Sequence, residues 1–175
     1  MKSKVVKICL IILAVMYLMI MFILLFGKGI HARSVRMDEV AEQGYCTIVL
    51  SHCNFKPFVS IHSYIQNLTT MDIGDFSFKQ IIGNTFMTFP LGIFLPCFWK
   101  KQKKFGVFVL TCFLSILCVE ILQVLTLLGS FDVDDLILNL IGCSIGFLSY
   151  HLLNAILTRV TRNNQNPDLS RKHIS

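Results

Sequence analysis

Long runs without a charged side chain are what most limits the fold of this chain. Residues 8–26 and 81–98 carry no charge, and residues 105–128 and 136–157 are nearly as apolar. Each run has about the 17–25 residues that an α-helix needs to cross roughly 30 Å of hydrocarbon. Only 15% of the residues are charged and the mean hydropathy is +0.67, which is unusual for a soluble domain. The sequence predicts an all-α membrane protein, a single domain over residues 1–175 built as a four-transmembrane-helix bundle.

The first run has a second interpretation, a cleaved secretory signal peptide, because Lys2, Lys4 and Lys7 precede it. Its uncharged stretch is longer than the usual apolar region of a signal peptide. The residues after it, Phe26-Gly27-Lys28-Gly29, do not resemble the A-x-A type of cleavage site. A retained membrane anchor is therefore the favoured interpretation.

The distribution of Lys and Arg predicts the orientation. Eleven of them lie in residues 1–7, 99–104 and 158–175, and five lie in residues 27–80. Basic residues concentrate on the cytoplasmic side of membrane proteins. We therefore expect a multi-pass protein of the cell membrane with both termini in the cytoplasm, an extracytoplasmic loop over 27–80 and a cytoplasmic tail over 158–175. Topology and contact with anionic lipids explain the net charge of +6, so nucleic-acid binding is not expected.

The outer loop is too apolar to be a passive tether. Phe58, Ile61, Ile65 and Leu68 recur at helical spacing, which predicts a partly amphipathic helix. Such a helix can lie in the membrane interface or pack over the bundle, and the sequence leaves both open. Cys46 and Cys53 can form a disulfide, but spacing does not decide it. The chain has no CxxC pair and no HExxH motif, and we expect neither metal nor cofactor.

Glu120 is an ionisable group inside an apolar run. A charged residue at the centre of a membrane helix costs about 2.5–3.5 kcal/mol even on lenient insertion scales. With 1.5 Å of rise per residue, Glu120, Asn84 and Asn139 all lie about 7–12 Å below the outer boundary. Gln123 is three residues from Glu120, so both side chains share a face. Polar groups at one depth on three helices can meet and satisfy one another.

The residues after this run form a short acidic hairpin and the start of the last helix. Asp132, Asp135 and Asn139 follow steps of three or four residues and share one stripe. Asp132 or Asp134 suits the N-cap. Further along the same helix, Gly142-x-x-x-Gly146 lets a neighbouring helix approach closely. Hydrogen bonding between helices explains such a polar set without any function, although it does not require an ionisable Glu.

Four blocks of this chain resemble the VanZ family, which is named for teicoplanin resistance. They are Asn54-Phe55-Lys56-Pro57-Phe58, then Gly83-Asn84 with Phe89-Pro90-Leu91-Gly92 and Leu95-Pro96, then Glu120-x-x-Gln123, and finally Phe131-Asp132-Val133-Asp134-Asp135 running on to Asn139 and Gly142. The resemblance covers residues 54–153. Many relatives have an Arg just before the acidic hairpin, where this chain has Gly129-Ser130.

The resemblance implies a role in tolerance of glycopeptide or lipoglycopeptide antibiotics at a bacterial cell envelope. The residues expected to form the site are Glu120, Asp132 and Asp135 in a catalytic role, and Asn54, Pro57, Asn84, Pro90, Gln123, Asp134 and Asn139 in ligand binding.

Three functions compete. The first is a non-enzymatic protein that binds membrane lipid, a lipid-linked cell-wall precursor or the antibiotic at the outer leaflet. The second is an enzyme acting on an envelope lipid, with Glu120 as general base and Asp132 or Asp135 assisting or holding a divalent cation. The third is a proton-coupled transporter, for which four helices are few unless the protein forms a homo-oligomer.

Overall fold

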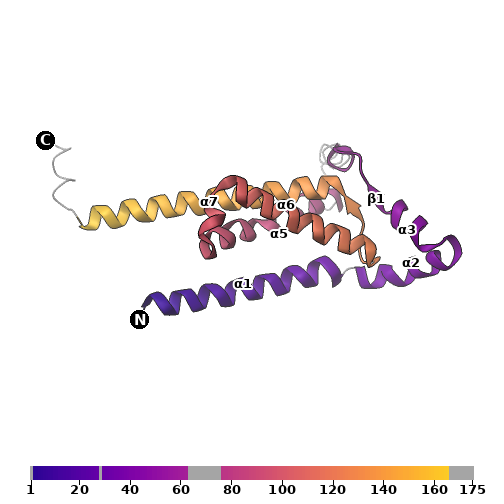
Figure 1. Cartoon of the computed structure of the whole chain (residues 1–175), viewed down its shortest axis with the longest axis horizontal. Helices are drawn as coiled ribbons and strands as arrows, with labels where there is room; N and C mark the ends of the chain where they lie inside the picture. The colour runs from indigo at the N-terminus through magenta and orange to yellow at the C-terminus, as the bar shows by residue number, and fades with distance from the viewer. Residues whose placement is uncertain (1, 28, 63–75, 166–175) are drawn as a thin grey trace.

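The computed structural model describes residues 2–27, 29–62 and 76–165 (Figure 1). The described chain is almost entirely helical, with two very short strands. The elements in chain order are α1 (Lys2–Gly27), α2 (Gly29–Gln43), α3 (Tyr45–Ser51), β1 (Cys53–Asn54), α5 (Phe76–Phe98), the 3-10 turn η1 (Lys100–Lys103), α6 (Phe105–Leu125), β2 (Phe131–Asp132) and α7 (Val133–Gln165).

Three helices are long and apolar enough to cross a membrane, over Lys4–Gly27, Phe105–Leu125 and Val133–Arg162. They correspond to three of the four predicted spans. The apolar stretch found in α5 is shorter, Ile82–Phe98. The boundaries also differ from the prediction: α6 ends at Leu125 rather than at residue 128, and α7 continues to Gln165 rather than ending at 157. The first part of the predicted tail is therefore helical.

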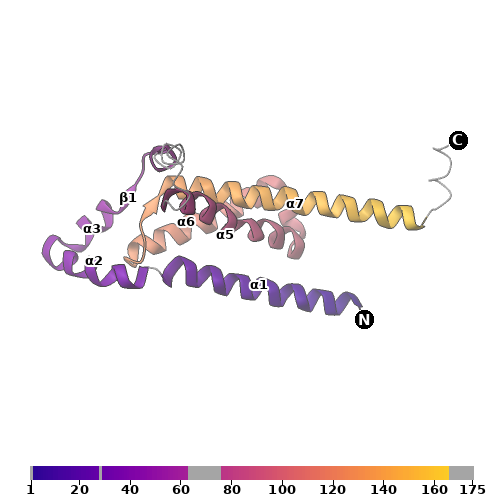
Figure 2. The same ribbon diagram turned by 180° about the vertical axis from the view of Figure 1, so that it is seen from behind.

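Helices α5, α6 and α7 lie side by side, and α1 runs along one side of them (Figures 1 and 2). The contact between α5 and α7 is the closest one, as the small residues predicted. A Cβ added at Gly142 would overlap the Thr85 carbonyl, and one added at Gly146 would overlap the Phe89 carbonyl. Both glycines are therefore needed for the two backbones to approach this closely.

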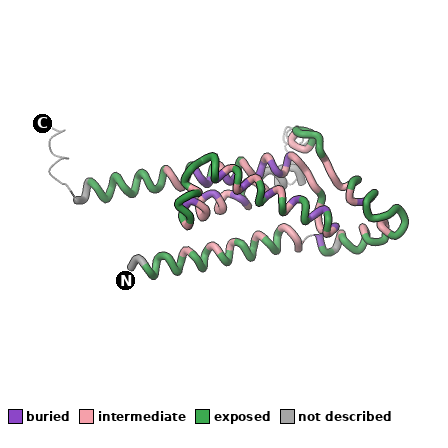
Figure 3. Tube along the Cα trace, viewed as in Figure 1, coloured by how far each residue is buried: buried purple, intermediate pink, exposed green. Residues whose placement is uncertain are grey.

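Burial is concentrated where α6 and α7 face each other, with α5 packed alongside (Figure 3). The buried core consists of Phe108, Cys112, Ile116, Leu136, Cys143 and Phe147. Helix α1 is mostly exposed. The Tyr17 hydroxyl links it to α5 by donating a hydrogen bond to the Met87 carbonyl at 2.6 Å. The start of α1 and the end of α7 lie at the same end of the molecule, opposite α2 and α3 (Figures 1 and 2).

The acidic segment differs from the predicted hairpin. After α6 the chain turns through residues 126–130, and β2 then pairs in parallel with β1 of the outer loop, with Cys53 opposite Phe131 and Asn54 opposite Asp132. A hairpin pairs a strand with its sequence neighbour, whereas here the partner comes from the loop before α5. The outer loop is therefore tied directly to the start of α7.

The rest of the outer loop contains two helices, α2 and α3, that the sequence did not predict. Helices α2 and α3 extend beyond the end of the bundle, and the chain returns through β1 to a helix that starts at Val59 (Figure 1). Of the predicted amphipathic helix, Ile65 and Leu68 lie outside the described residues. Cys46 and Cys53 are both free thiols. Burial raises the pKa of the Cys53 thiol, which disfavours the thiolate that disulfide formation needs.

Candidate functional site

Asp134 holds the outer loop onto the first turn of α7. Its side chain is fully buried and accepts three backbone hydrogen bonds, from the N–H of Phe58 at 2.6 Å, Ser60 at 2.8 Å and Ile61 at 3.0 Å. These groups stand at the start of the helix that begins at Val59, where N–H groups have no partner within their own helix. Asp134 therefore caps a helix from a distant part of the chain, and both of its oxygens are engaged.

The sequence around Pro57 explains why the loop presents these N–H groups. The Asn54 side-chain oxygen accepts from the Lys56 N–H at 3.1 Å, a local bond that initiates turns. Pro57 is followed by Phe58 with φ of 67°, and a Pro followed by a left-handed residue is the pattern of a type II turn. Asn54 and Pro57 thus shape the turn that Asp134 binds, and Pro57 is exposed.

Asp132 joins β2, α7 and the outer loop. One of its oxygens accepts the Asp134 N–H at 2.9 Å, which makes Asp132 the N-cap of α7. The other accepts the Ser60 hydroxyl at 2.6 Å, and the Asn54 amide donates to Asp132 at 3.3 Å. Of the two N-cap candidates, Asp132 takes this position on α7. Ser60, which the sequence did not single out, contacts both aspartates.

Asn84 and Asp135 connect α5 to α7. The Asn84 amide donates to the Asp135 carboxylate at 2.5 Å. One turn further along each helix, the Thr88 hydroxyl donates to the backbone carbonyl of Asn139 at 2.8 Å. The predicted meeting of polar groups from α5 and α7 is therefore present, with Thr88 as an additional member. Pro90 lies within α5, half-buried, near the same contact.

Glu120 and Asn139 are buried, each 4% exposed, and both line a cavity of about 60 Å³. The Glu120 Oε2 and Asn139 Oδ1 atoms have no hydrogen-bond partner. The Asp132 backbone N–H and the carboxylates of Asp135 and Asp132 lie close enough to interact electrostatically with Glu120. The prediction that the polar residues satisfy one another therefore holds only in part, because these two acceptors have no hydrogen-bond partner.

The Gln123 side chain binds α1. Its amide donates to the Leu25 carbonyl of α1 at 2.9 Å, and its backbone carbonyl accepts the N–H groups of Leu128 and Gly129. Gln123 therefore links α1 to the end of α6 and closes the turn that leads to β2.

Two residues at this turn were not identified from the sequence. Arg36 of α2 donates to the carbonyls of Leu127 at 2.8 Å and Gly129 at 3.1 Å, and the Tyr45 hydroxyl of α3 donates to the Leu125 carbonyl. These carbonyls lie at or just past the end of α6, where a helix leaves its acceptors unpaired. Arg36 thus brings a guanidinium from another helix to the turn before the acidic segment. No spacing in the sequence signals this contact.

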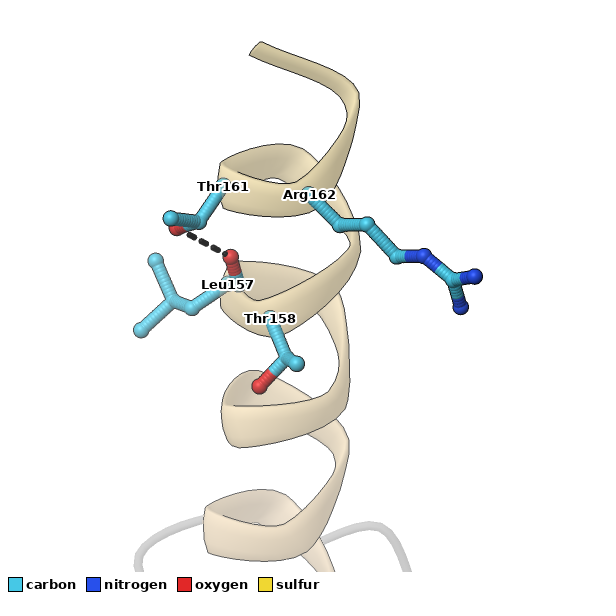
Figure 4. A pocket seen from close by; sticks show the side chains of 4 residues that line it. All are labelled: Leu157, Thr158, Thr161 and Arg162. Carbon is cyan, nitrogen blue, oxygen red and sulfur yellow. Dashed lines mark hydrogen bonds between the residues drawn. The ribbon is translucent and has the colours of Figure 1, made fainter. Parts of the chain in front are cut away.

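Two further features concern possible ligand sites. Among residues 2–27, 29–62 and 76–165, no group of three or more His, Cys, Asp or Glu side chains is arranged to hold a metal ion. A second hollow near the end of α7 is lined by Leu157, Thr158, Thr161 and Arg162 of that one helix, and the Thr161 hydroxyl donates to the Leu157 carbonyl while Arg162 points outward (Figure 4). A hollow on a single helix has no opposing wall, so we assign it no role.

Comparison with known proteins supports the resemblance found in the sequence. A family model described as VanZ/LLP1 matches residues 11–154. No curated protein and no solved structure gives a significant match. Since the family match covers more than half of the 175 residues, this chain belongs to the VanZ/LLP1 family.

Proposed function

We propose that this protein contributes to tolerance of glycopeptide and lipoglycopeptide antibiotics through an outward-facing polar site. In this proposal Ile82–Phe98 is the fourth membrane span, both termini are cytoplasmic, and β1, β2 and the start of α7 lie at the outer surface. The site consists of Asn84, Glu120, Gln123, Asp132, Asp135 and Asn139. Family membership supports the class of function.

The observation that carries the proposal is the pair of unpartnered acceptors on Glu120 and Asn139. A buried polar atom without a partner costs about 1–3 kcal/mol. The surrounding polar groups are satisfied within the protein: Asp134 and Asp132 hold the outer loop, and Asn84 binds Asp135. Unpaired acceptors that persist beside a satisfied network are typical of a binding site rather than of structural hydrogen bonding.

The test is antibiotic susceptibility of cells that lack the gene, complemented with variants of the protein. We expect deletion to lower the minimum inhibitory concentrations of teicoplanin and a lipoglycopeptide, and the wild-type gene to restore them. Glu120→Gln keeps the shape of the side chain and removes its charge, so it should fail to restore tolerance although it reaches the membrane. Glu42→Gln makes the same change on the exposed face of α2 and is the matched control. Unchanged susceptibility after deletion would contradict the proposal.

An enzyme acting on an envelope lipid is the second candidate, favoured by the free Oε2 atom of Glu120 at a cavity. A general base needs an oxygen that is available to accept a proton. The measurement is turnover of labelled envelope lipids by the purified protein, with and without added divalent cations. Turnover by the wild type that is lost in Glu120→Gln would establish this function, and absence of turnover under both conditions would exclude Glu120 as a base for these lipids.

A further inference from the structure

The cavity beside Glu120 has both polar and apolar lining residues. Its apolar lining comes from α1, α5 and α6, and its polar lining is Thr88, Ser115, Glu120 and Asn139. The apolar residues are Met21, Leu25, Met87, Leu91, Ile116 and Val119. The volume of about 60 Å³ exceeds the about 10–15 Å³ that a single water requires. A wall of this kind suits an alkyl chain better than water alone.

Two hydrogen bonds hold α1 over this cavity. Tyr17 donates to the Met87 carbonyl on one side, and Gln123 donates to the Leu25 carbonyl on the other. Between them, Met21 and Leu25 form part of the cavity wall. Ser115 lines the cavity and is also exposed on α6, so the lining of the cavity extends to the exposed surface of that helix.

The chemistry of the polar lining requires a donor. Glu120 Oε2 and Asn139 Oδ1 are both acceptors, and neither has a hydrogen-bond partner. Two other buried atoms of the described residues are also unpartnered, Gln102 Oε1 and His151 Nε2, but neither residue lines this cavity. The carboxylates of Asp132 and Asp135 lie near Glu120, and a positively charged donor is attracted to this cluster more strongly than a neutral one.

We infer that this cavity binds the primary ammonium group of an amphiphile, with the nitrogen between Glu120 and Asn139 and the alkyl chain along Met21, Leu91 and Ile116. An ammonium supplies three N–H donors and a positive charge, and no acceptor that would conflict with the two orphaned oxygens. The group can belong to a membrane-lipid headgroup or to a free amphiphile such as an amine-bearing antibiotic. This inference rests on the proposed function, since it names what the outward-facing polar site would bind.

The test measures binding of radiolabelled hexylammonium to the full chain in phosphatidylcholine nanodiscs by equilibrium dialysis, with empty discs subtracted. Hexanol and hexanoate are the neutral and anionic probes of equal chain length. We expect saturable binding of hexylammonium and binding of both other probes at least about tenfold weaker. Glu120→Gln should weaken hexylammonium binding about 30-fold, equivalent to about 2 kcal/mol, whereas Glu42→Gln should leave it unchanged.

Two results would overturn the inference. Hexanol binding as tightly as hexylammonium to the wild type would make the cavity a neutral hydroxyl or water site, and this comparison requires no variant to fold. Equal hexylammonium binding by wild type and Glu120→Gln would place the amine elsewhere. Adding phosphatidylethanolamine to the discs assigns the source of the amine. If it raises the apparent dissociation constant of hexylammonium, the lipid headgroup occupies the site. If that constant is unchanged, a free amphiphile occupies it.

The two proposals fail separately. If hexylammonium does not bind but Glu120→Gln still abolishes antibiotic tolerance, the ammonium site is wrong and the proposed function stands. If hexylammonium binds through Glu120 but gene deletion leaves susceptibility unchanged, the site is real and the function in tolerance is wrong.

Discussion

The substitution Asp134→Asn tests whether the start of α7 holds the outer loop. Three N–H groups, from Phe58, Ser60 and Ile61, donate to this fully buried carboxylate. An Asn amide has one oxygen to accept and an NH₂ that opposes the remaining donors. In the more favourable orientation of the Asn amide, its oxygen keeps the hydrogen bonds from the Ser60 and Ile61 N–H groups, and the Phe58 N–H is left unpaired.

An unpaired buried N–H costs about 1–3 kcal/mol, and the two retained bonds lose the additional strength of a charged acceptor. We therefore expect the free energy of opening of this loop to fall by about 2–4 kcal/mol. At about 1.4 kcal/mol per factor of ten, this is a roughly 30- to 700-fold faster hydrogen exchange at the three amides, provided that exchange follows local opening.

The assay is hydrogen–deuterium exchange with mass spectrometry of the detergent-solubilised protein, followed in peptides that span residues 54–62. Asp38→Asn on the exposed face of α2 is the matched control and should leave exchange in these peptides unchanged. Equal exchange in Asp134→Asn and wild type would refute the reasoning, because it would mean that the three N–H groups do not depend on the carboxylate.

Two further predictions concern the packing around the site, and both are measured as thermal unfolding midpoints in detergent. Gly142→Ala should destabilise the protein by about 1–3 kcal/mol, because its Cβ overlaps the α5 backbone. The control is Gly106→Ala, which has open space around it and should be neutral or stabilising. Equal effects of the two substitutions would contradict the close contact of α5 and α7. Arg36→Gln should destabilise the protein by about 1–3 kcal/mol, because two charge-assisted hydrogen bonds to carbonyls are lost. The control is Arg33→Gln, exposed on the same helix, which should leave the midpoint unchanged. An unchanged midpoint for Arg36→Gln would mean that water replaces the guanidinium.

The membrane helices could be predicted because hydropathy along the chain reports directly on burial in lipid. The runs at 8–26, 105–128 and 136–157 mark α1, α6 and α7, with errors only at the ends. The error at the end of α6 has a physical cause: Leu127 adopts a left-handed φ of 59°, which stops the helix within the apolar run. Hydropathy carries no information about backbone conformation, so this stop was not visible in the sequence.

The sequence predicted which residues belong to the site, but it did not predict which of them contact one another. The sequence singled out the Asn54 block and the acidic block separately, but nothing in either one indicates that Asp134 binds backbone N–H groups 73 to 76 residues away. Strands of two residues, such as β1 and β2, carry no recognisable period, and their pairing depends on the fold around them. Arg36 was missed for the same reason, since its acceptors are backbone carbonyls of another segment.

The cost of placing Glu120 in an apolar helix is not fully offset within the protein. If hydrogen bonding between helices were its only role, Gln123 or Asn139 would be expected to approach it, yet Gln123 binds α1 and the Asn139 oxygen also lacks a partner. Asp132 accepts a hydrogen bond from the outer loop and Asp135 accepts one from Asn84, and as carboxylates neither can neutralise Glu120. A carboxylate retained at such a cost, beside a second unpaired acceptor, is what the proposed binding of a ligand would explain. For this reason Glu120→Gln separates a structural protein from a binding one more sharply than any change in the surrounding network.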